Sequence, residues 1–162
     1  MSSARELVGS EDEFLFLAGD EVVLDAPPAE VWQRLEGDAQ RRLLEALSKR
    51  FVGREVLEDL PDGYRCRTTA RVSLGRRRSF ESVVWLEEPT CSVEVQLGER
   101  TDLRYTTTYA PAGGGTLVRC EQAYRAKRSS FESTSVVGAL HQRAVAVVAD
   151  RLDAARRLVA GG

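Results

Sequence analysis

Apolar and polar residues alternate most clearly in the stretch YRCRTTARVSL, residues 64–74. An alternation with a period of two places successive side chains on opposite faces of a strand. One face of this stretch carries Tyr64, Cys66, Thr68, Ala70, Val72 and Leu74, and the other carries mostly arginine and threonine. The pattern predicts a strand with one buried face and one solvent-exposed face.

Residues 50–127 contain five turn signals that divide the segment into six predicted strands. The signals are PDG at 61–63, LGR at 74–76, EEPT at 87–90, LGER at 97–100 and PAGGG at 111–115. Such short connections favour an antiparallel meander. The alternation predicts the following inward-facing residues: Cys91, Val93, Val95 and Leu97; Leu103, Tyr105, Thr107 and Tyr109; and Val118, Cys120, Gln122 and Tyr124.

A further strand is predicted at residues 14–25, which are rich in Phe, Leu and Val, with a bend or bulge near Ala18 and Gly19. Two prolines then end the strand, and proline is well tolerated in the first turn of a helix. The predicted helix presents Val31, Trp32 and Leu35 on one face. A second short helix is predicted to follow, with Asp38 as its cap and Leu43, Leu44 and Leu47 as its apolar side.

The last predicted element is one amphipathic helix of about 25 residues. Its apolar stripe consists of Val137, Leu140, Ala144, Val148, Leu152, Ala155 and Leu158. The order of elements predicts an α+β fold in which a seven-stranded antiparallel sheet curls around the long C-terminal helix, with two short helices after the first strand. A chain of 162 residues fits a single domain, 1–162, of which residues 1–12 are expected to be a mobile N-terminal tail.

Two stretches, VVLDAPPAEVWQRL and GGGTLVRCEQAY, resemble the opening strand–Ala-Pro–helix signature and the late Gly-x-Thr-x-Val strand of the START-related SRPBCC superfamily, including its polyketide cyclase/dehydrase-like group. The tryptophan that often follows the first helix in that superfamily is missing after Asp38. The resemblance implies the helix-grip fold. It also implies a deep cavity between sheet and C-terminal helix, which different members use for lipids, polyketides, plant hormones or aromatic intermediates.

Composition narrows the function classes. The net charge of −2 and the content of 43% hydrophobic and 30% charged residues give no overall field that attracts nucleic acid or anionic membrane. The chain has no apolar run of about 20 residues and no basic, apolar leader at its start, so we expect a cytoplasmic protein without stable membrane insertion. Cys66, Cys91 and Cys120 lack metal-site spacing, and we expect reduced thiols, no metal and no cofactor.

Candidate ligand-binding residues come from the predicted inward faces. A buried amide at Gln122 needs a hydrogen-bond partner, and Tyr64, Tyr105, Tyr109 and Tyr124 would combine apolar area with a polar tip. The C-terminal helix would add Leu140, His141 and Ala144 to the cavity wall. The competing interpretation is that all of these residues serve as ordinary core and boundary residues.

The favoured hypothesis is therefore the binding of a mostly apolar or amphipathic small molecule in the cavity, without catalysis. One alternative is a cyclase or dehydratase with His141, the only histidine, as acid or base and Tyr105 or Tyr124 as proton donor. Another is a protein-interaction module that uses a basic convex face. That face would consist of Arg65, Arg67, Arg71, Arg76, Arg77 and Arg78, with Glu81 and Glu94 available to neutralise it.

Overall fold

The computed structural model describes residues 2–37, 51–127 and 134–160. Along the chain the elements are α1 (Ala4–Val8), η1 (Glu11–Glu13), β1 (Leu15–Leu24), α2 (Pro28–Glu36), β2 (Phe51–Leu60), β3 (Gly63–Arg71), η2 (Ser73–Gly75), β4 (Arg77–Glu87), β5 (Cys91–Leu97), β6 (Thr101–Ala112), β7 (Gly115–Ala126) and α4 (Thr134–Ala160). The short helix predicted around Leu43, Leu44 and Leu47 lies outside the described residues.

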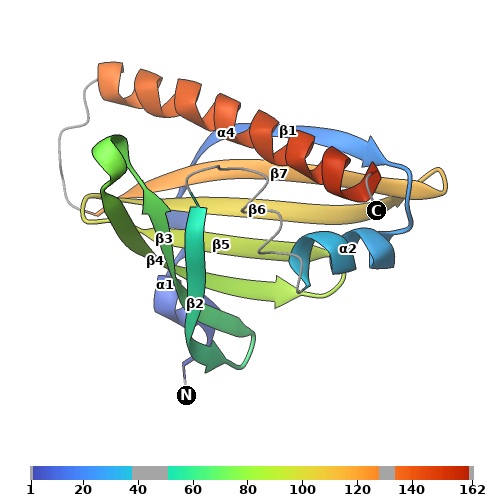
Figure 1. Ribbon diagram of the computed structural model, residues 1–162, viewed down its shortest axis with the longest axis horizontal. Helices are drawn as coiled ribbons and strands as arrows, with labels where there is room; N and C mark the ends of the chain where they lie inside the picture. Colours follow the sequence, from blue (N-terminus) through green and yellow to red (C-terminus); the bar gives the residue numbers. More distant parts are fainter. Residues whose placement is uncertain (1, 38–50, 128–133, 161–162) are drawn as a thin grey trace.

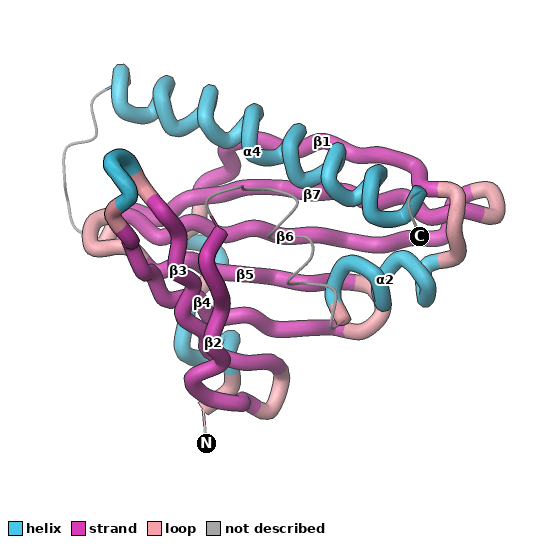
Figure 2. The backbone as a smooth tube through the Cα atoms, in the orientation of Figure 1, coloured by secondary structure: helices cyan, strands magenta, loops and turns pink. Residues whose placement is uncertain are grey.

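The strands form one antiparallel sheet in the order β1-β7-β6-β5-β4-β3-β2. The first strand pairs with the last, so β1 and β2 are the two edges of the sheet. The long helix α4 crosses one face of the sheet, and α2 lies next to the C-terminal end of α4 (Figures 1 and 2). This arrangement confirms the predicted helix-grip fold, and the face that α4 covers is called the concave face below.

Local sequence signals explain the corners of this fold. The register of β1 shifts between Phe16 and Ala18, close to the predicted bulge. Pro28 begins α2, where a missing backbone N–H costs nothing because the first turn has no intrahelical acceptor for it. Between β6 and β7, Gly113 and Gly114 have φ angles of 56° and 88°, and glycine adopts such left-handed conformations without strain.

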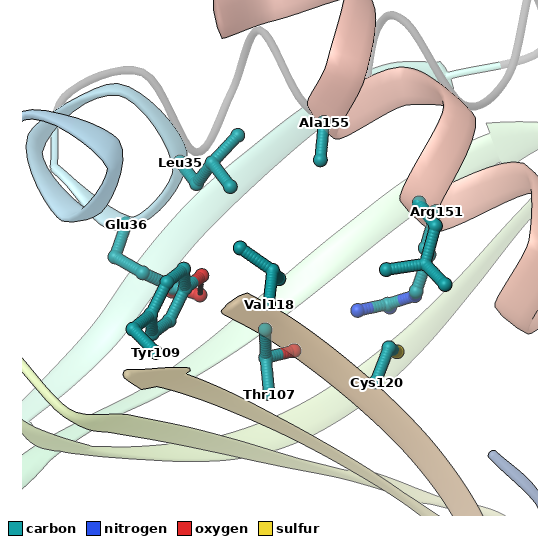
Figure 3. Close-up of a pocket in the computed structure, with 9 residues that line it drawn as sticks. Leu35, Glu36, Thr107, Tyr109, Val118, Cys120, Arg151 and Ala155 are labelled. Carbon is teal, nitrogen blue, oxygen red and sulfur yellow. Dashed lines mark hydrogen bonds between the residues drawn. The ribbon is translucent and has the colours of Figure 1, made fainter. Parts of the chain in front are cut away.

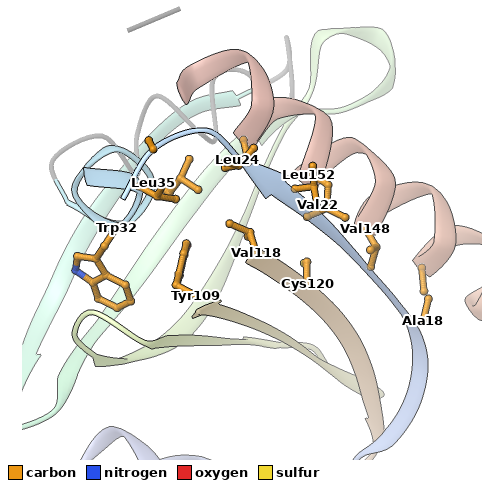
Figure 4. Close-up of a cluster of buried hydrophobic side chains, with 14 of the residues drawn as sticks. Ala18, Val22, Leu24, Trp32, Leu35, Tyr109, Val118, Cys120, Val148 and Leu152 are labelled. Carbon is orange, nitrogen blue, oxygen red and sulfur yellow. The ribbon is translucent and has the colours of Figure 1, made fainter. Parts of the chain in front are cut away.

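An apolar cluster packs between α4, α2 and the concave face of the sheet, mainly at β1 and β7 (Figure 4). From α4 the predicted stripe contributes Ala144, Val148, Leu152 and Ala155, all buried. Opposite them lie Leu17, Ala18, Val22, Leu24, Val31, Trp32, Leu35, Tyr109, Val118, Cys120 and Tyr124. The rings of Trp32 and Tyr109 meet edge to face with centroids 5.3 Å apart, a favourable aromatic geometry. This cluster anchors α4 along β1 and β7.

A second apolar cluster covers the opposite, convex face of the sheet. It consists of Ala4, Val8, Phe14, Leu60, Val83, Trp85, Val93, Val95 and Ala123, with Cys91 and Leu97 packed against it. The prediction that Cys91, Val93, Val95 and Leu97 face inward toward the C-terminal helix is therefore wrong. Strand alternation separates two faces correctly, but both faces of β5 are largely buried here, and only the layers above them decide which is which.

The N-terminal residues close this convex cluster. Where a tail was expected, residues Ala4–Val8 form α1, capped by Ser3, and Ala4 and Val8 are buried. The carboxylate of Asp62 accepts the backbone N–H of Ala4 at 2.6 Å. Farther along, the guanidinium carbons of Arg104 and Arg125 lie 4.8 and 4.6 Å from the centroid of the Phe14 ring. These contacts hold the N-terminal segment against the sheet.

Candidate functional site between the sheet and the C-terminal helix

A cavity of about 230 Å³ lies between α4 and the middle strands of the sheet. Its lining residues are Arg54 from β2, Phe80 from β4, Glu94 and Gln96 from β5, Tyr105 from β6, and Val147, Asp150 and Arg151 from α4. Four of these eight residues carry charged side chains, while Phe80, Tyr105 and Val147 supply apolar surface. The cavity wall is therefore amphipathic, in contrast to the mostly apolar cavity expected from the sequence.

An ion pair occupies one side of this cavity. Nη2 of Arg54 donates to Oε1 of Glu94 at 2.9 Å, and Nε of Arg54 donates to the hydroxyl of Thr68 at 3.0 Å. Both charged side chains are only about a tenth exposed, at 9% and 10%. The remaining nitrogen, Nη1 of Arg54, is buried and has no hydrogen-bond partner in the part of the chain that the structure describes. Glu94 was expected to neutralise convex arginines, and instead it pairs with Arg54 on the concave face.

Arg151 lies on the opposite wall and comes from α4. Its guanidinium carbon is 4.1 Å from the centroid of the Tyr105 ring, so the two side chains stack. Tyr105 is in turn hydrogen-bonded by Gln122, its cross-strand neighbour on β7. Burial is the largest cause that raises the pKa of Tyr105. The phenol thus stays neutral and supports the guanidinium with its ring face.

A smaller cavity of about 20 Å³ lies beyond Arg151, toward α2 (Figure 3). It is lined by Leu35, Glu36, Thr107, Tyr109, Val118, Cys120, Arg151, Leu152 and Ala155. The Tyr109 hydroxyl donates to Oε1 of Glu36 at 2.6 Å (Figure 3). A space of this size holds about one water molecule when polar groups surround it. Arg151 belongs to the walls of both cavities and therefore separates them.

Burial controls the ionisation of the groups around these cavities. It raises the pKa of Glu36, although hydrogen bonds from Tyr109 and Ser92 and the charge of Arg151 act in the opposite direction. Burial, together with the charge of Glu36, raises the pKa of Tyr109 well above 10.0. The same desolvation raises the pKa of Tyr64 to about 12 and that of Cys66 to about 11. The buried thiol is therefore no activated nucleophile.

The structure distributes the candidate residues from the sequence over several environments. Tyr105 lines the larger cavity and Tyr109 lines the smaller one. Gln122 reaches the larger cavity only through its bond to Tyr105. Tyr124 and Ala144 are buried in the concave cluster and Leu140 packs against it, while Tyr64 is half-buried on β3; none of these four lines either cavity.

His141 lies away from both cavities. The residue is solvent-exposed, and its Nδ1 atom is 2.7 Å from the carbonyl oxygen of Leu17 on β1. Because a carbonyl only accepts hydrogen bonds, Nδ1 carries the proton in this contact. His141 thus links α4 to the edge strand and is not positioned to exchange protons with a molecule in either cavity.

The candidate site residues from the sequence did not include five charged residues that line the cavities: Arg54, Glu94, Asp150, Arg151 and Glu36. Arg151 carried a usable signal, since it lies three residues after Val148 and four before Ala155 and thus falls on the apolar stripe of the helix. Glu94 was hidden by the inverted face assignment of its strand. Arg54 and Glu36 gave no signal, because charged residues on edge strands and at helix ends are common on protein surfaces.

Arg65 and Arg67 on the convex face are exposed and pair with nearby glutamates. Arg65 contacts Glu81 at 3.3 Å and Glu58 at 3.4 Å, and Arg67 contacts Glu81 at 3.5 Å. Such exposed ion pairs contribute little energy. They do neutralise the part of the face next to β4, as expected for Glu81.

The chain resembles known proteins in its fold but not in its sequence. No protein-family model matches the chain, and no curated protein matches it in sequence. Among solved structures, Ara h 8.0201 matches with a TM-score of 0.68 at 17% identity, over 90% of this chain and 97% of that one. A START superfamily protein from Mycobacterium smegmatis matches with a TM-score of 0.62 at 13% identity, over 88% and 98%.

A third match is BexL, a di-domain ARO/CYC protein from the BE-7585A biosynthetic pathway. Its TM-score is 0.68 at 18% identity, and the match covers 95% of this chain and 52% of BexL, so the chain spans about half the length of that di-domain protein. At identities of 13–18%, these likenesses show the fold alone, and the chain shares the helix-grip fold of these proteins. Among the described helices, none is both long and apolar enough to cross a membrane.

Proposed function

We propose that this helix-grip protein binds a small amphipathic molecule, with one or two rings, in the cavity of about 230 Å³ between sheet and α4. The main support for this proposal is the cavity itself. Its wall combines the apolar surfaces of Phe80, Tyr105 and Val147 with convergent polar groups. For comparison, an apolar cavity of about 150 Å³ is sufficient for benzene. The volume here fits a somewhat larger aromatic body.

The physical basis of binding would be divided between the two kinds of wall. Burying apolar area contributes about 25 cal/mol per Å², and the charged and amide groups orient the polar end of the ligand. The fold likeness to a START superfamily protein and to ARO/CYC proteins supports a cavity-based function. The charged residues in the wall favour an amphipathic ligand over the mostly apolar one inferred from the sequence.

A cyclase or dehydratase activity is the second candidate, and one specific pair of residues favours it. Glu36 and Tyr109 share a short hydrogen bond next to Arg151, and burial raises the pKa of Glu36. A carboxyl group with a raised pKa suits proton transfer near neutral pH. In an enzyme of this kind Glu36 would be the acid or base, in the place that the sequence analysis gave to His141.

Native mass spectrometry of the purified protein tests the binding proposal. We expect a bound small molecule that is released on denaturation. In the variant Val147→Trp, the indole would fill the cavity, and the bound mass should disappear. Val145→Trp is the matched control, because Val145 lies on the same helix but is 51% exposed, and this variant should retain the ligand.

Two results would contradict the proposal. One is a ligand that stays bound in Val147→Trp, which would place it elsewhere. The other is an apo mass in the wild type together with no thermal shift from a panel of one-ring and two-ring aromatic compounds. Circular dichroism of both tryptophan variants shows whether the fold is preserved.

A further inference from the structure

The cavity wall contains two guanidinium groups, and among the described residues only one of them has a carboxylate partner at ion-pair distance. Arg54 is paired with Glu94 at 2.9 Å. For Arg151, no carboxylate oxygen of the described part of the chain lies within the 4.0 Å of an ion pair. A guanidinium that is largely removed from water without a bonded anion is energetically unfavourable. The site therefore has a positive charge that is available to a ligand.

Three carboxyl groups share a cavity wall with Arg151, and none of them fills this role. Glu94 acts on Arg151 through its charge but is bonded to Arg54. Glu36 lines the smaller cavity together with Arg151, but its Oε1 atom is bonded to Tyr109, and burial raises its pKa toward the neutral acid. Asp150 precedes Arg151 directly on α4 and is exposed. Adjacent residues on a helix point in different directions and do not pair face to face.

We propose that Arg151 forms the anion-binding subsite of the cavity and contacts a carboxylate or phenolate oxygen of the ligand. The inference rests on the proposed binding function and adds the chemical class of the ligand to it. Arginine suits this role because its planar group presents two parallel N–H donors to a carboxylate.

The surroundings of Arg151 prepare it for such a contact. Tyr105 stacks on the face of the guanidinium at 4.1 Å, which restrains its orientation and leaves the edge with its N–H donors available. Gln122 fixes Tyr105 from the neighbouring strand. Across the cavity, the charge of Arg54 is balanced by Glu94, but its Nη1 atom has no hydrogen-bond acceptor among the described residues. Phe80 and Val147 provide the apolar surface for the rest of the ligand.

A pair of probes with the same rings tests the proposal by isothermal titration calorimetry. The first is 2-naphthoate, which carries a carboxylate, and the second is 2-naphthamide, which is neutral. We expect the wild type to bind 2-naphthoate at least about tenfold more tightly, because hydrogen bonds to charged groups are the strong ones. In Arg151→Met, which keeps the length and apolar stem, this preference should fall to near unity.

Arg143→Met is the matched control. Arg143 is an exposed arginine of the same helix, so its removal changes the net charge of the protein equally and should leave the preference intact. Arg151→Lys keeps the charge without the two-pronged geometry and should retain part of the preference. Circular dichroism checks that each variant is folded.

The outcomes separate the two proposals. If the wild type binds both probes equally, or if Arg143→Met loses the preference as fully as Arg151→Met, the anion subsite is wrong while binding in the cavity stands. If neither probe binds the wild type, both proposals are contradicted. The comparison of the two probes in the wild type needs no variant, so it decides the matter even if Arg151→Met does not fold.

Discussion

The two faces of the sheet are built on different principles. On the convex face, Val83, Trp85, Val93 and Val95 form a closed apolar layer under α1, and Trp85 is only 2% exposed. On the concave face, the corresponding part of the same strands carries Ser82, Glu94 and Gln96 and opens into a cavity. Neighbouring residues of one strand thus serve two separate tasks.

The apolar packing and the polar cavity wall lie in different parts of the sheet. α4 packs its apolar stripe on β1 and β7, so the concave cluster is concentrated at that side of the sheet. Strands β4, β5 and β6 face the cavity instead, and the convex side chains of β4 and β5 supply packing that the concave side lacks there. The convex cluster under α1 therefore allows the concave face to hold polar groups for a ligand.

The largest effect is expected from removing a large side chain of the convex cluster, which tests whether this cluster stabilises the fold. Trp85→Ala deletes the largest side chain of that cluster, and we expect the free energy of unfolding to fall by about 3–5 kcal/mol. Urea unfolding followed by circular dichroism measures it. Phe16→Ala is the control, because Phe16 is 62% exposed, and its loss should cost less than about 0.5 kcal/mol. Similar effects of both substitutions would show that the convex cluster is not a main source of stability.

A second test acts on the concave charges. Glu94→Leu leaves the buried guanidinium of Arg54 without its counter-ion, and we expect a loss of about 3 kcal/mol in unfolding free energy. The double variant Arg54→Met/Glu94→Leu removes both charges and should recover most of this loss, since an apolar pair needs no counter-ion. Urea unfolding of the three proteins forms the comparison. A double variant that is as unstable as the single one would mean that the pair itself, rather than the orphaned charge, stabilises the fold.

The smallest effect concerns Glu36 and depends on pH. Folding raises the pKa of this carboxyl group above 4.5, so its contribution to stability is fully present below that value and is lost as the pH rises through the folded-state pKa. The free energy of unfolding of the wild type, relative to Glu36→Gln, should therefore decrease as the pH rises above 4.5 and through the folded-state pKa. The decrease amounts to about 1.4 kcal/mol for every tenfold difference between the acid dissociation constants of Glu36 in the unfolded and folded protein.

Unfolding of both proteins by urea at a series of pH values measures this decrease. Glu30→Gln serves as the control, because Glu30 lies on the same helix with a side chain that is 45% exposed, and its difference from the wild type should vary much less. A flat difference for Glu36→Gln would show that the carboxyl group is already solvated.

The helix-grip architecture was predictable from the chain because its signals are local. Strand alternation, five turn signals, the double proline before α2 and the stripe of α4 each specify a conformation within a few residues. Tyr105 and Tyr109 could be assigned to the interior for the same reason. The bond between Gln122 and Tyr105 corresponds to the ordinary structural interpretation of that buried amide.

Only the tertiary structure shows which face of each strand lies under the C-terminal helix and which charged side chains line the cavity. The sequence determined that β5 has two faces, but Val93 and Glu94 exchange their expected places because α1, which was predicted to be a tail, covers the convex side. Likewise, Arg151 becomes a binding group only because Tyr105 and the cavity meet it across the fold. A strand's period of two is a property of neighbouring residues, whereas the identity of the covering layer depends on contacts between segments far apart in the chain.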